Sequence, residues 1–421
     1  MASSPYVRAG ELRLRARDTR DGVSGLYVHV PFCFHKCHYC DFYSIARQTP
    51  DRMQAFVDRL LREADRWTDR SAGSIRPRTV FFGGGTPSLL PLDAMARLLS
   101  GLRDRFDLSN VDEWTVEVNP ATATCEYMAM LLASGVTRIS IGAQSFDERD
   151  LKALERHHDP EDVPRTVEFA RKAGFSRINI DLIFAVPGQT PERWAQILEQ
   201  ALVLTTPHLS CYALTYEPNT PLAVRRRLGH VQPVNEAAEM EMLLTSRRRL
   251  SAAMLEAYEI SNFAVQGEAC RHNLLYWDAG DYIGLGPSAA SHISGIRWKN
   301  RAHLGEWEHA LDTTAELPAS EFEILSFGQR VGEHAMLRLR VAAGIVFASF
   351  KNRWGIDAQQ VFADPMDRYL RAGMLTVDAR RVALTETGIP VADAIASEFL
   401  AAAAKIEPPE SADQAPGPSL G

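Results

Sequence analysis

Six stretches of apolar, β-branched and aromatic residues alternate with helical patterns along the first half of the chain. The strand-like stretches are residues 25–32, 79–84, 114–120, 138–145, 177–186 and 208–216. Between them, apolar residues recur every three or four positions, as in amphipathic helices, over 51–67, 92–106, 125–135, 162–174 and 191–204. This regular succession predicts an α/β fold with a parallel sheet and right-handed crossovers. A doubly wound open sheet and a barrel-like sheet both fit the pattern.

The alternation ends near residue 230. A helical pattern is followed by a segment rich in Gly, aromatics and His, which we interpret as irregular structure covering a site. Further on, helical patterns over 319–339 and 355–373 precede a hairpin pattern over 374–388, a combination that resembles a winged-helix module. We therefore predict a flexible N-terminal segment (1–23), a core domain (24–260), an irregular covering segment (261–315), a C-terminal domain (316–402) and a disordered tail (403–421).

Composition narrows the functional class. The chain has 421 residues, 46% of them hydrophobic, and a formal net charge of −7. This size supports two or three packed domains, and the acidic balance gives no reason to expect binding to nucleic acid or to a membrane surface. No apolar run approaches the length of a membrane span, and the charged N-terminus lacks the apolar centre of a signal peptide. We expect a cytoplasmic protein whose six cysteines are ligands or core residues rather than disulfides.

Three cysteines, Cys33, Cys37 and Cys40, follow the first predicted strand with the spacing C-x3-C-x2-C. A structural zinc site normally takes four ligands, and His35 and His38 could complete one here. Iron–sulfur clusters also prefer thiolates. A [4Fe–4S] cube held by three thiolates leaves one iron open to an exchangeable ligand, which favours the cluster because a triplet keeps a place for a substrate or cofactor. Zinc and three ordinary buried cysteines remain the alternatives.

Polar residues and glycines follow the other predicted strands at their carboxyl ends. They are the 83–87 loop (GGGTP), Glu117, Asn119, Gln144, Ser145, Asp181, the 186–190 loop (VPGQT), Tyr216 and Glu217. In parallel α/β folds the carboxyl ends of the strands form the ligand-binding rim. We therefore expect a ligand site there, although strand ends with purely local roles would give the same pattern.

An ordered series of motifs resembles known families. The cysteine spacing after a first strand, with an aromatic residue beside the last cysteine, resembles the radical S-adenosylmethionine (SAM) superfamily. The stretches LYVHVPFC, FFGGGTPSLL, VEVNP, RISIGAQSF, NIDLIFAVPGQT, YEISNFA, RHNLLYW and DYIGLGPSAAS together resemble the HemW family, over residues 24–400. The resemblance implies a partial (β/α)6, TIM-like radical SAM barrel, followed by a C-terminal HemN-type helical, winged-helix-like domain. It thereby decides between the two architectures.

The resemblance also implies roles for individual residues. Cys33, Cys37 and Cys40 would hold a [4Fe–4S] cluster. The residues implied to contact SAM are Tyr27, Gly84, Gly85, Thr86, Glu117, Gln144, Arg156 and Asp181. Glycines allow close backbone approach to a ligand, and the loop lacks the Lys-Ser/Thr of a phosphate cradle. For each residue the alternative is a strand-end side chain that satisfies local backbone. We expect Arg156 to lie in a helix with Glu155 beside it, where such a local role is also open to it.

Two features bear on function. The oxidase that the family resembles carries a further cysteine where this chain has Phe42, and this chain reaches its cysteine loop too early to include much of the oxidase's N-terminal region. The stretch 272–277 (HNLLYW) matches a family motif implicated in heme binding, which makes His272 the candidate axial ligand of heme iron. The alternative is a packed histidine bonded to Asp278 or Asp281.

We therefore expect a heme chaperone that binds a [4Fe–4S] cluster, SAM and heme and passes heme to an acceptor protein. One alternative is a radical SAM enzyme of the oxygen-independent coproporphyrinogen III oxidase type, acting on a porphyrin or another substrate by hydrogen abstraction. A zinc-stabilised barrel that binds a small molecule is another. The expected partner is the heme acceptor, without nucleic acid. Weak membrane association through that acceptor, and a homodimer, are both compatible with the sequence.

Overall fold

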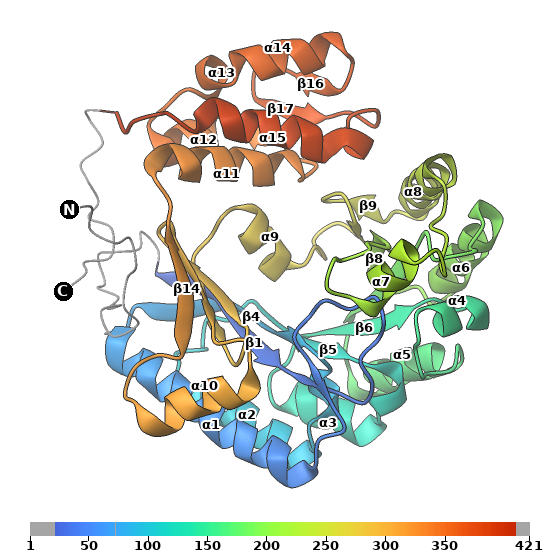
Figure 1. Cartoon of the computed structure of the whole chain (residues 1–421), viewed down its shortest axis with the longest axis vertical. Helices are drawn as coiled ribbons and strands as arrows, with labels where there is room; N and C mark the ends of the chain where they lie inside the picture. The colour runs from blue at the N-terminus through green and yellow to red at the C-terminus, as the bar shows by residue number, and fades with distance from the viewer. Residues whose placement is uncertain (1–21, 72, 410–421) are drawn as a thin grey trace.

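The computed structural model describes residues 22–71 and 73–409 and confirms the alternation of strands and helices (Figure 1). The six predicted strands are β1 (Val23–Val30), β4 (Ile75–Gly84), β5 (Glu113–Val118), β6 (Arg138–Gln144), β7 (Arg177–Phe184) and β8 (His208–Ala213). The helices between them are α1 (Pro50–Ser71), α2 (Leu92–Arg103), α3 (Cys125–Ala133), α4 (Glu148–Ala153), α5 (Asp162–Ala173) and α6 (Pro191–Val203). Each strand pairs in parallel with the next along the chain.

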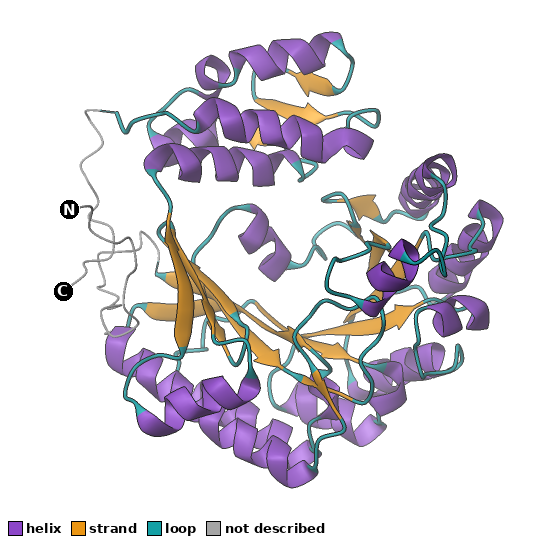
Figure 2. Ribbon diagram, viewed as in Figure 1, coloured by secondary structure: helices purple, strands orange, loops and turns teal. Residues whose placement is uncertain are grey.

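The sheet curves without closing, so the barrel is partial. Within the described residues it has 12 strands, in the order β14-β13-β12-β11-β1-β4-β5-β6-β7-β8-β10-β9. Figure 2 shows helices covering its convex side, while helix α9 (Arg271–Trp277) lies on the concave side, toward the C-terminal domain. This is the predicted partial barrel rather than a doubly wound sheet, because helices do not cover both faces.

The main core lies between the sheet and its outer helices. Helix α1 presents Phe56, Leu60 and Trp67 to this core, all at most 1% exposed, and burying one such side chain contributes about 1.5–3 kcal/mol. In β6, Ile141 belongs to the core, whereas the adjacent Ser140 bonds a carboxylate of the neighbouring strand. Because side chains of a strand alternate between faces, the concave face is the polar one.

We expected the segment 261–315 to be irregular, but it forms regular strands that extend the sheet beyond β8 at one edge and beyond β1 at the other. It contains β10 (Asn262–Ala264), α9, β11 (Tyr282–Leu285), β12 (Ala290–Ile293), β13 (Ile296–Asn300) and α10 (Leu304–Thr313). Strand β11 pairs in parallel with β1, and β12 and β13 follow in antiparallel order. Periodicity did not indicate these strands because each has only three to five residues, and because Gly284 interrupts β11 and Gly295 directly precedes β13.

Residues 319–324, which we expected to be helical, form strand β14 (Ala319–Ile324) and pair with β13. The strand presents Phe322 to the main core, where its ring stacks on Trp298 with centroids 5.9 Å apart. The main sheet therefore extends past residue 316, where we placed the start of the C-terminal domain.

The C-terminal domain has a hydrophobic core of its own. Its elements are α11 (Phe327–Leu339), β15 (Ile345–Val346), α12 (Phe347–Trp354), α13 (Ala358–Val361), α14 (Ala363–Arg371), β16 (Leu375–Val377), β17 (Arg381–Leu384) and α15 (Ala392–Ala403). Phe350, Phe362 and Phe399 are buried together at its centre. Strands β16 and β17 pair in antiparallel order, which confirms the predicted hairpin.

The shorter elements and the chain ends complete the description. The remaining elements named below are β2 (Phe32–Cys33), β3 (Ile45–Ala46), α7 (Pro221–Arg227), α8 (Glu236–Ala252) and β9 (Glu256–Ala257). The predicted N-terminal segment lies outside the described residues except for residues 22 and 23, and Val23 already belongs to β1. Of the predicted disordered tail, 410–421 lies outside them, but Ala403 ends helix α15 and Ile406 packs against the C-terminal core.

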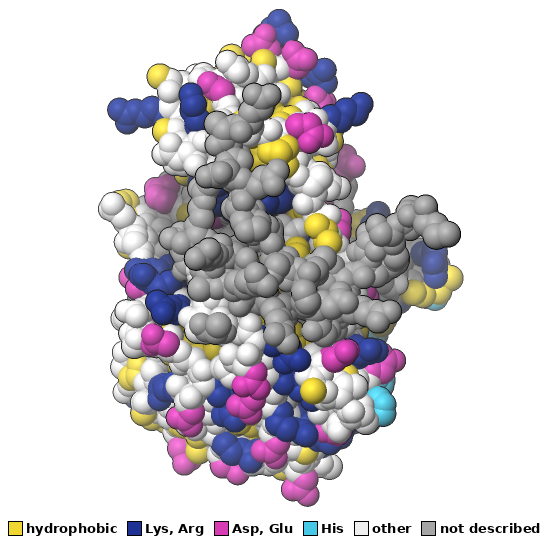
Figure 3. Space-filling model, turned by 90° about the vertical axis from the view of Figure 1, so that its left-hand side faces the viewer, with side chains coloured by type: hydrophobic (Ala, Val, Ile, Leu, Met, Phe, Trp, Pro, Cys, Tyr) yellow, Lys and Arg dark blue, Asp and Glu magenta, His cyan; other side chains and the backbone are white. Residues whose placement is uncertain are grey.

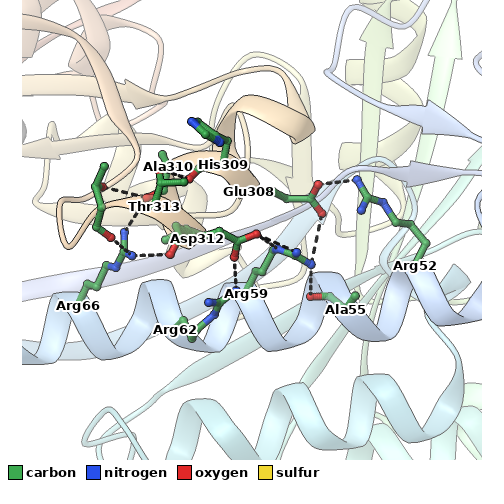
Figure 4. Close-up of polar contacts among 12 residues, drawn as sticks. Arg52, Ala55, Arg59, Arg62, Arg66, Glu308, His309, Ala310, Asp312 and Thr313 are labelled. Atoms are coloured by element: carbon green, nitrogen blue, oxygen red, sulfur yellow. Dashed lines mark hydrogen bonds and ion pairs between the residues drawn. The ribbon is translucent and has the colours of Figure 1, made fainter.

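Polar contacts fasten α10 to α1, at one end of the sheet (Figure 4). Asp312 accepts hydrogen bonds from Arg59 at 2.9 Å and from Arg62 at 2.5 Å, and Glu308 accepts one from Arg52 at 2.5 Å. The pairs of Asp312 are exposed and contribute little individually, whereas Glu308 is buried, as is the apolar Trp307 of the same helix.

The surface carries charges of both signs. On the face shown in Figure 3, Lys and Arg side chains are interspersed with Asp and Glu over the described elements. Among the described residues, no helix is both long and apolar enough to cross a bilayer.

Candidate functional site

The three cysteines lie on one loop that follows β1. Strand β2 pairs with β3, which closes the loop at its base. Phe32 anchors it, because this side chain is fully buried and packs edge-on against Phe56 of α1, with ring centroids 5.0 Å apart. Within the loop, the Cys40 N–H donates to the Cys37 carbonyl at 3.2 Å and forms a tight turn. All three thiols, including that of Cys33, are free and their residues are partly exposed.

Hydrogen-bond donors approach two of the thiols. The Thr86 hydroxyl donates to Cys33 Sγ at 3.7 Å, and Arg156 Nη1 donates to Cys37 Sγ at 3.9 Å. Burial raises the pKa of Cys33, and burial together with the neighbouring thiols raises the pKa of Cys40 to about 11. Because metals bind the thiolate, the two donors and a bound cation would offset the cost of ionising this loop.

The residues that could complete a zinc shell have another partner. His35 Nε2 lies 3.1 Å from one carboxylate oxygen of Glu155, and His38 Nδ1 lies 2.9 Å from the other. The described residues include no group of three or more Cys, His, Asp or Glu side chains arranged to hold a metal ion. Three soft thiols on one partly exposed loop do suit an iron–sulfur cluster, in which each thiolate binds a different iron.

The GGGTP loop continues β4 and packs closely against β1 and the cysteine loop. Gly84 has a φ of +107°, and a Cβ there would lie 2.6 Å from the His29 ring. A Cβ on Gly85 would lie 2.6 Å from the Phe32 carbonyl oxygen. The Thr86 N–H donates to that same carbonyl at 2.7 Å. Glycines at 84 and 85 are thus required by this close approach, and their contact with SAM stays a prediction.

Glu117 and Asp181 alternate with core residues of their strands and therefore face the concave side. Burial raises the pKa of Glu117 to about 8, with a further contribution from the charge of Asp181. The pKa of Asp181 is likewise raised by burial, against hydrogen bonds from its neighbours. Tyr27 lies within electrostatic range, since burial and the charge of Glu117 raise its pKa. The interior therefore suits a cationic ligand that donates hydrogen bonds to both carboxylates.

Asp181 belongs to a network of buried polar side chains. Ser140 donates to one carboxylate oxygen at 2.8 Å, and Asn179 donates to the other at 2.9 Å. His208 Nδ1 lies 2.6 Å from the Asn179 amide oxygen and connects the network to Tyr258, whose hydroxyl lies 3.0 Å from His208 Nε2. The network fixes the carboxylate in one orientation.

Gln144 and Arg156 meet at the end of β6. Gln144 has a left-handed φ of +66°, next to a register shift between β6 and β7. Arg156 follows α4 rather than lying in a helix, and its Nη2 donates to the Gly142 carbonyl at 2.6 Å. Burial disfavours its charge, but Tyr39 and Cys37 outweigh that effect and raise the pKa of Arg156. The expected helical position of Arg156 is wrong, and its side chain connects β6 to the cysteine loop.

His272 lies on α9, away from the cysteine rim. Its side chain is fully buried, with Nδ1 2.8 Å from the Thr79 hydroxyl and Nε2 2.8 Å from the Tyr276 hydroxyl. The ring stacks on Phe81 with centroids 5.3 Å apart, and burial lowers the pKa of His272 to about 3. Both nitrogens are thus engaged within the protein. The packed alternative is favoured, with partners other than Asp278 and Asp281.

Glu113 explains how α9 is held. This carboxylate accepts the backbone N–H groups of Arg271 at 3.0 Å and His272 at 3.1 Å, at the start of the helix. It also accepts the Cys270 thiol at 3.2 Å and a hydrogen bond from Arg177 at 2.9 Å. A carboxylate at a helix N-terminus satisfies otherwise unpaired N–H groups.

A cavity of about 1420 Å3, which no sequence motif led us to expect, lies beside the cysteine loop. We call it the α4–α5 cleft, because the connection between these helices, 154–161, forms one wall. The cysteine loop contributes Phe34 and His35, and α7 contributes Arg225. The dense polar stretch ERHHD at 155–159 was a signal that could have indicated it.

Both the sequence and the fold of the chain are similar to those of known proteins. Residues 27–201 match the family model of the radical SAM superfamily, and 328–391 match that of the HemN C-terminal domain. A protein of Lactococcus lactis named heme chaperone HemW is 33% identical over 89% of this chain and 96% of its own length. Proteins of the same name from Mycobacterium tuberculosis and Bacillus subtilis are 35% and 33% identical, over 89% and 90% of this chain and 94% and 99% of their own lengths.

A solved structure shows the same fold. Coproporphyrinogen III oxidase (HemN) from Escherichia coli, a radical SAM enzyme, matches with a TM-score of 0.79 at 22% identity, over 91% of this chain and 92% of its own. The fold is therefore a radical SAM barrel with a HemN-type C-terminal domain. With near full-length similarity to three proteins of one name, the chain belongs to the HemW family.

Proposed function

We propose that this protein is a heme chaperone that holds a [4Fe–4S] cluster, binds SAM and heme, and passes heme to an acceptor protein. The observation that carries the proposal is the near full-length similarity to relatives named heme chaperones. The site adds support, because three free thiols on one loop sit at the rim of the concave face.

Cys33, Cys37 and Cys40 would hold the cluster. Bound there, a cluster with three protein ligands supplies an iron that is open to an exchangeable ligand, and it stores one electron. The chain's own task is to keep the loop in shape. Thr86 and Arg156 donate hydrogen bonds to two of the thiols, and Glu155 holds the two loop histidines.

SAM would lie on the concave side. Its sulfonium and ammonium charges match the two carboxylates of Glu117 and Asp181, which disfavour one another's ionisation in the absence of a cation. Gly84 and Gly85 bring backbone close to this region, and Gln144 lies at the neighbouring strand end. Glu117 would then accept hydrogen bonds from the ligand in its ionised form.

We extend the proposal to partners and location. The acceptor of heme is a protein, without involvement of nucleic acid, and the chaperone works in the cytoplasm as a monomer or homodimer. Weak association with a membrane would occur through the acceptor. The formal net charge of −7 supports a partner other than nucleic acid.

Hemin titration of the anaerobically reconstituted protein tests the proposal, with product assays on the same sample. We expect hemin to shift its Soret band in a saturable way on binding. The reconstituted protein should contain iron and sulfide, and a Cys33→Ala/Cys37→Ala/Cys40→Ala variant should contain neither. No decarboxylation of coproporphyrinogen III should be detected. Robust decarboxylation by a protein that does not bind hemin would overturn the proposal in favour of the oxidase-type enzyme.

A further inference from the structure

Glu155 follows helix α4 in a backbone conformation that the ends of helices usually give to glycine. Its φ is +52°. The Glu155 N–H donates to the Lys152 carbonyl at 3.2 Å, and the Arg156 N–H donates to the Leu151 carbonyl at 2.9 Å. This pair of hydrogen bonds forms a Schellman motif, whose left-handed residue is usually Gly because a Cβ there is strained. A carboxylate at this position therefore needs an explanation beyond the ending of the helix.

The carboxylate of Glu155 reaches the cysteine loop on both sides of Cys37. One oxygen lies 3.1 Å from His35 Nε2, and the other lies 2.9 Å from His38 Nδ1. The two histidines flank Cys37 in the sequence, two residues before it and one residue after it. A side chain that contacts both rings at once restricts the loop at the cysteine between them.

The residues next to the carboxylate contact the same part of the loop. The Cys37 thiol donates to the Glu155 carbonyl at 3.7 Å, and Arg156 Nη1 donates to Cys37 Sγ at 3.9 Å. The ring of His157 stands edge-on to that of His35, with centroids 4.7 Å apart. Three consecutive residues thus meet the loop around one of its three thiols. The left-handed backbone at Glu155 permits this, because it turns the chain directly after α4.

The contacts of Glu155 differ in their relation to a bound cluster. Cluster binding requires the thiolate of Cys37, and a thiolate cannot donate to the Glu155 carbonyl. The contacts of the carboxylate with His35 and His38 do not involve the thiol, so its deprotonation leaves their partners in place. The carboxylate is therefore the part of Glu155 that can order the loop both before and after cluster binding.

We propose that Glu155 is a positioning residue for the cluster, which fixes Cys37 relative to the other two cysteines through its contacts with His35 and His38. The inference rests on the proposed function and deepens it, because it assigns the preparation of the cysteine loop to one side chain. A loop that is already ordered loses less conformational entropy when it binds its ligand. Glu155 itself does not bind the cluster.

A Glu155→Gly variant separates this role from a purely structural one, because glycine suits the left-handed backbone and removes only the carboxylate. Full-length protein purified without its cluster is reconstituted anaerobically with ferrous iron and sulfide, and the visible absorbance is followed. We expect the variant to acquire its cluster about five- to tenfold more slowly than the parent. The midpoint of its thermal unfolding before reconstitution should not fall, since relief of the backbone strain offsets the lost contacts. Slow loading with a lowered midpoint would mark Glu155 as an ordinary structural residue.

The end of helix α8 offers a matched control. Met254 has a φ of +64°, and the Leu255 N–H donates to the Leu250 carbonyl at 2.9 Å, as in the turn after α4. The Met254 side chain is 73% exposed. A Met254→Gly variant makes the same change to the backbone, and we expect it to acquire its cluster at the rate of the parent. Equally slow loading in both glycine variants would overturn the proposal, because the effect would then not come from the carboxylate.

Two further variants test whether the histidines transmit the effect. Glu155→Gln should load within about twofold of the parent rate, because an amide can accept a hydrogen bond from one ring and donate to the other. His35→Ala/His38→Ala should load as slowly as Glu155→Gly, and the combination of all three changes should slow loading no further. Additive slowing, or a Gln variant as slow as the Gly variant, would contradict positioning through the histidines.

The outcomes separate this inference from the proposed function. If the parent protein acquires no iron and sulfide, the proposed function fails and the role of Glu155 fails with it. If the parent acquires its cluster and Glu155→Gly does so at the same rate, the role of Glu155 alone is overturned, and the hemin titration still decides the proposed function.

Discussion

At the scale of single residues, the concave interior owes its character to two carboxylates that disfavour one another's charge. Glu117 accepts a hydrogen bond from the Gly84 N–H, yet burial and Asp181 still raise its pKa to about 8. Near neutral pH the free protein therefore keeps a proton on Glu117 for much of the time. A cationic ligand that needs the carboxylate must displace that proton.

The affinity for SAM should therefore depend on pH. Because the pKa of Glu117 in the ligand-free protein is raised to about 8, we expect affinity to increase by up to about tenfold per pH unit as pH rises toward 8, and to level off above it. Dissociation constants of reconstituted protein at several pH values measure this. The Glu117→Gln variant serves as the control, since it keeps any pH dependence of SAM itself. A parent profile that parallels that of the variant would contradict the prediction.

Arg156 offers a second prediction at this scale. Arg156→Ala removes hydrogen bonds to Cys37 Sγ and to the Gly142 carbonyl. Hydrogen bonds to charged groups contribute about 1.5–3 kcal/mol, so the variant should lose its cluster at least about tenfold faster in air. Bleaching of the visible absorbance and the iron content give the rate. Arg165→Ala, on the exposed side of α5, should behave like the parent, and equal rates in all three proteins would refute a role in holding the loop.

At the scale of elements, α9 is held at both ends by charged side chains. Glu113 caps its start, and Asp278 follows its end. Arg353 of α12 donates to the Asp278 carbonyl at 2.6 Å and to the Ala279 carbonyl at 2.8 Å. A cation at a helix C-terminus satisfies unpaired carbonyls and complements the helix dipole. The C-terminal domain thus stabilises the end of α9 through the hydrogen bonds of Arg353.

Loss of the Arg353 hydrogen bonds should lower the stability of the protein measurably. We expect Arg353→Ala to lower the free energy of unfolding by about 1–3 kcal/mol, because it leaves carbonyls of the α9 end without their donor. Urea unfolding followed by circular dichroism measures the difference. The control is Arg371→Ala, since that side chain is exposed on α14, and a loss no larger than the control's would show that α9 is held without Arg353.

The elements also show what the sequence could and could not predict. The long strands and amphipathic helices repeat their pattern locally, so their order and the rim position of Cys33 and Glu117 followed from periodicity. The strands within 261–315 are too short to show a period. The environment of His272 depends on Thr79 and Glu113, which precede it by 193 and 159 residues. No local pattern encodes such contacts, so the motif alone could not distinguish a free imidazole from a buried one.

At the scale of the whole molecule, two hydrophobic cores are joined through a small number of connections. Strand β14 leads from the main sheet into α11, and an isolated bridge pairs Glu259 with Val341. The end of α9 supplies further contacts, including Arg340 over the Trp277 ring at 5.6 Å, and Arg297 of β13 pairs with Glu333 of α11 at 2.6 Å. Figure 1 shows α9 between the barrel and the C-terminal domain. We therefore expect α9 to contribute to the cooperativity between the cores.

Calorimetry can test this dependence. The parent protein should unfold in one transition, because the contacts of α9 join the cores. An Arg340→Ala/Arg353→Ala variant removes two of those contacts, leaves the pairs of His334 and Arg338 with Asp278 in place, and leaves each core intact. We expect the transition to broaden toward two, the lower one from the smaller C-terminal core. Asp312→Ala, which breaks exposed ion pairs within the barrel domain (Figure 4), should lower the single transition slightly without splitting it. One sharp transition in the double variant would mean that the remaining connections, such as β14 and the ion pair between Arg297 and Glu333, suffice to unite the two cores without Arg340 and Arg353.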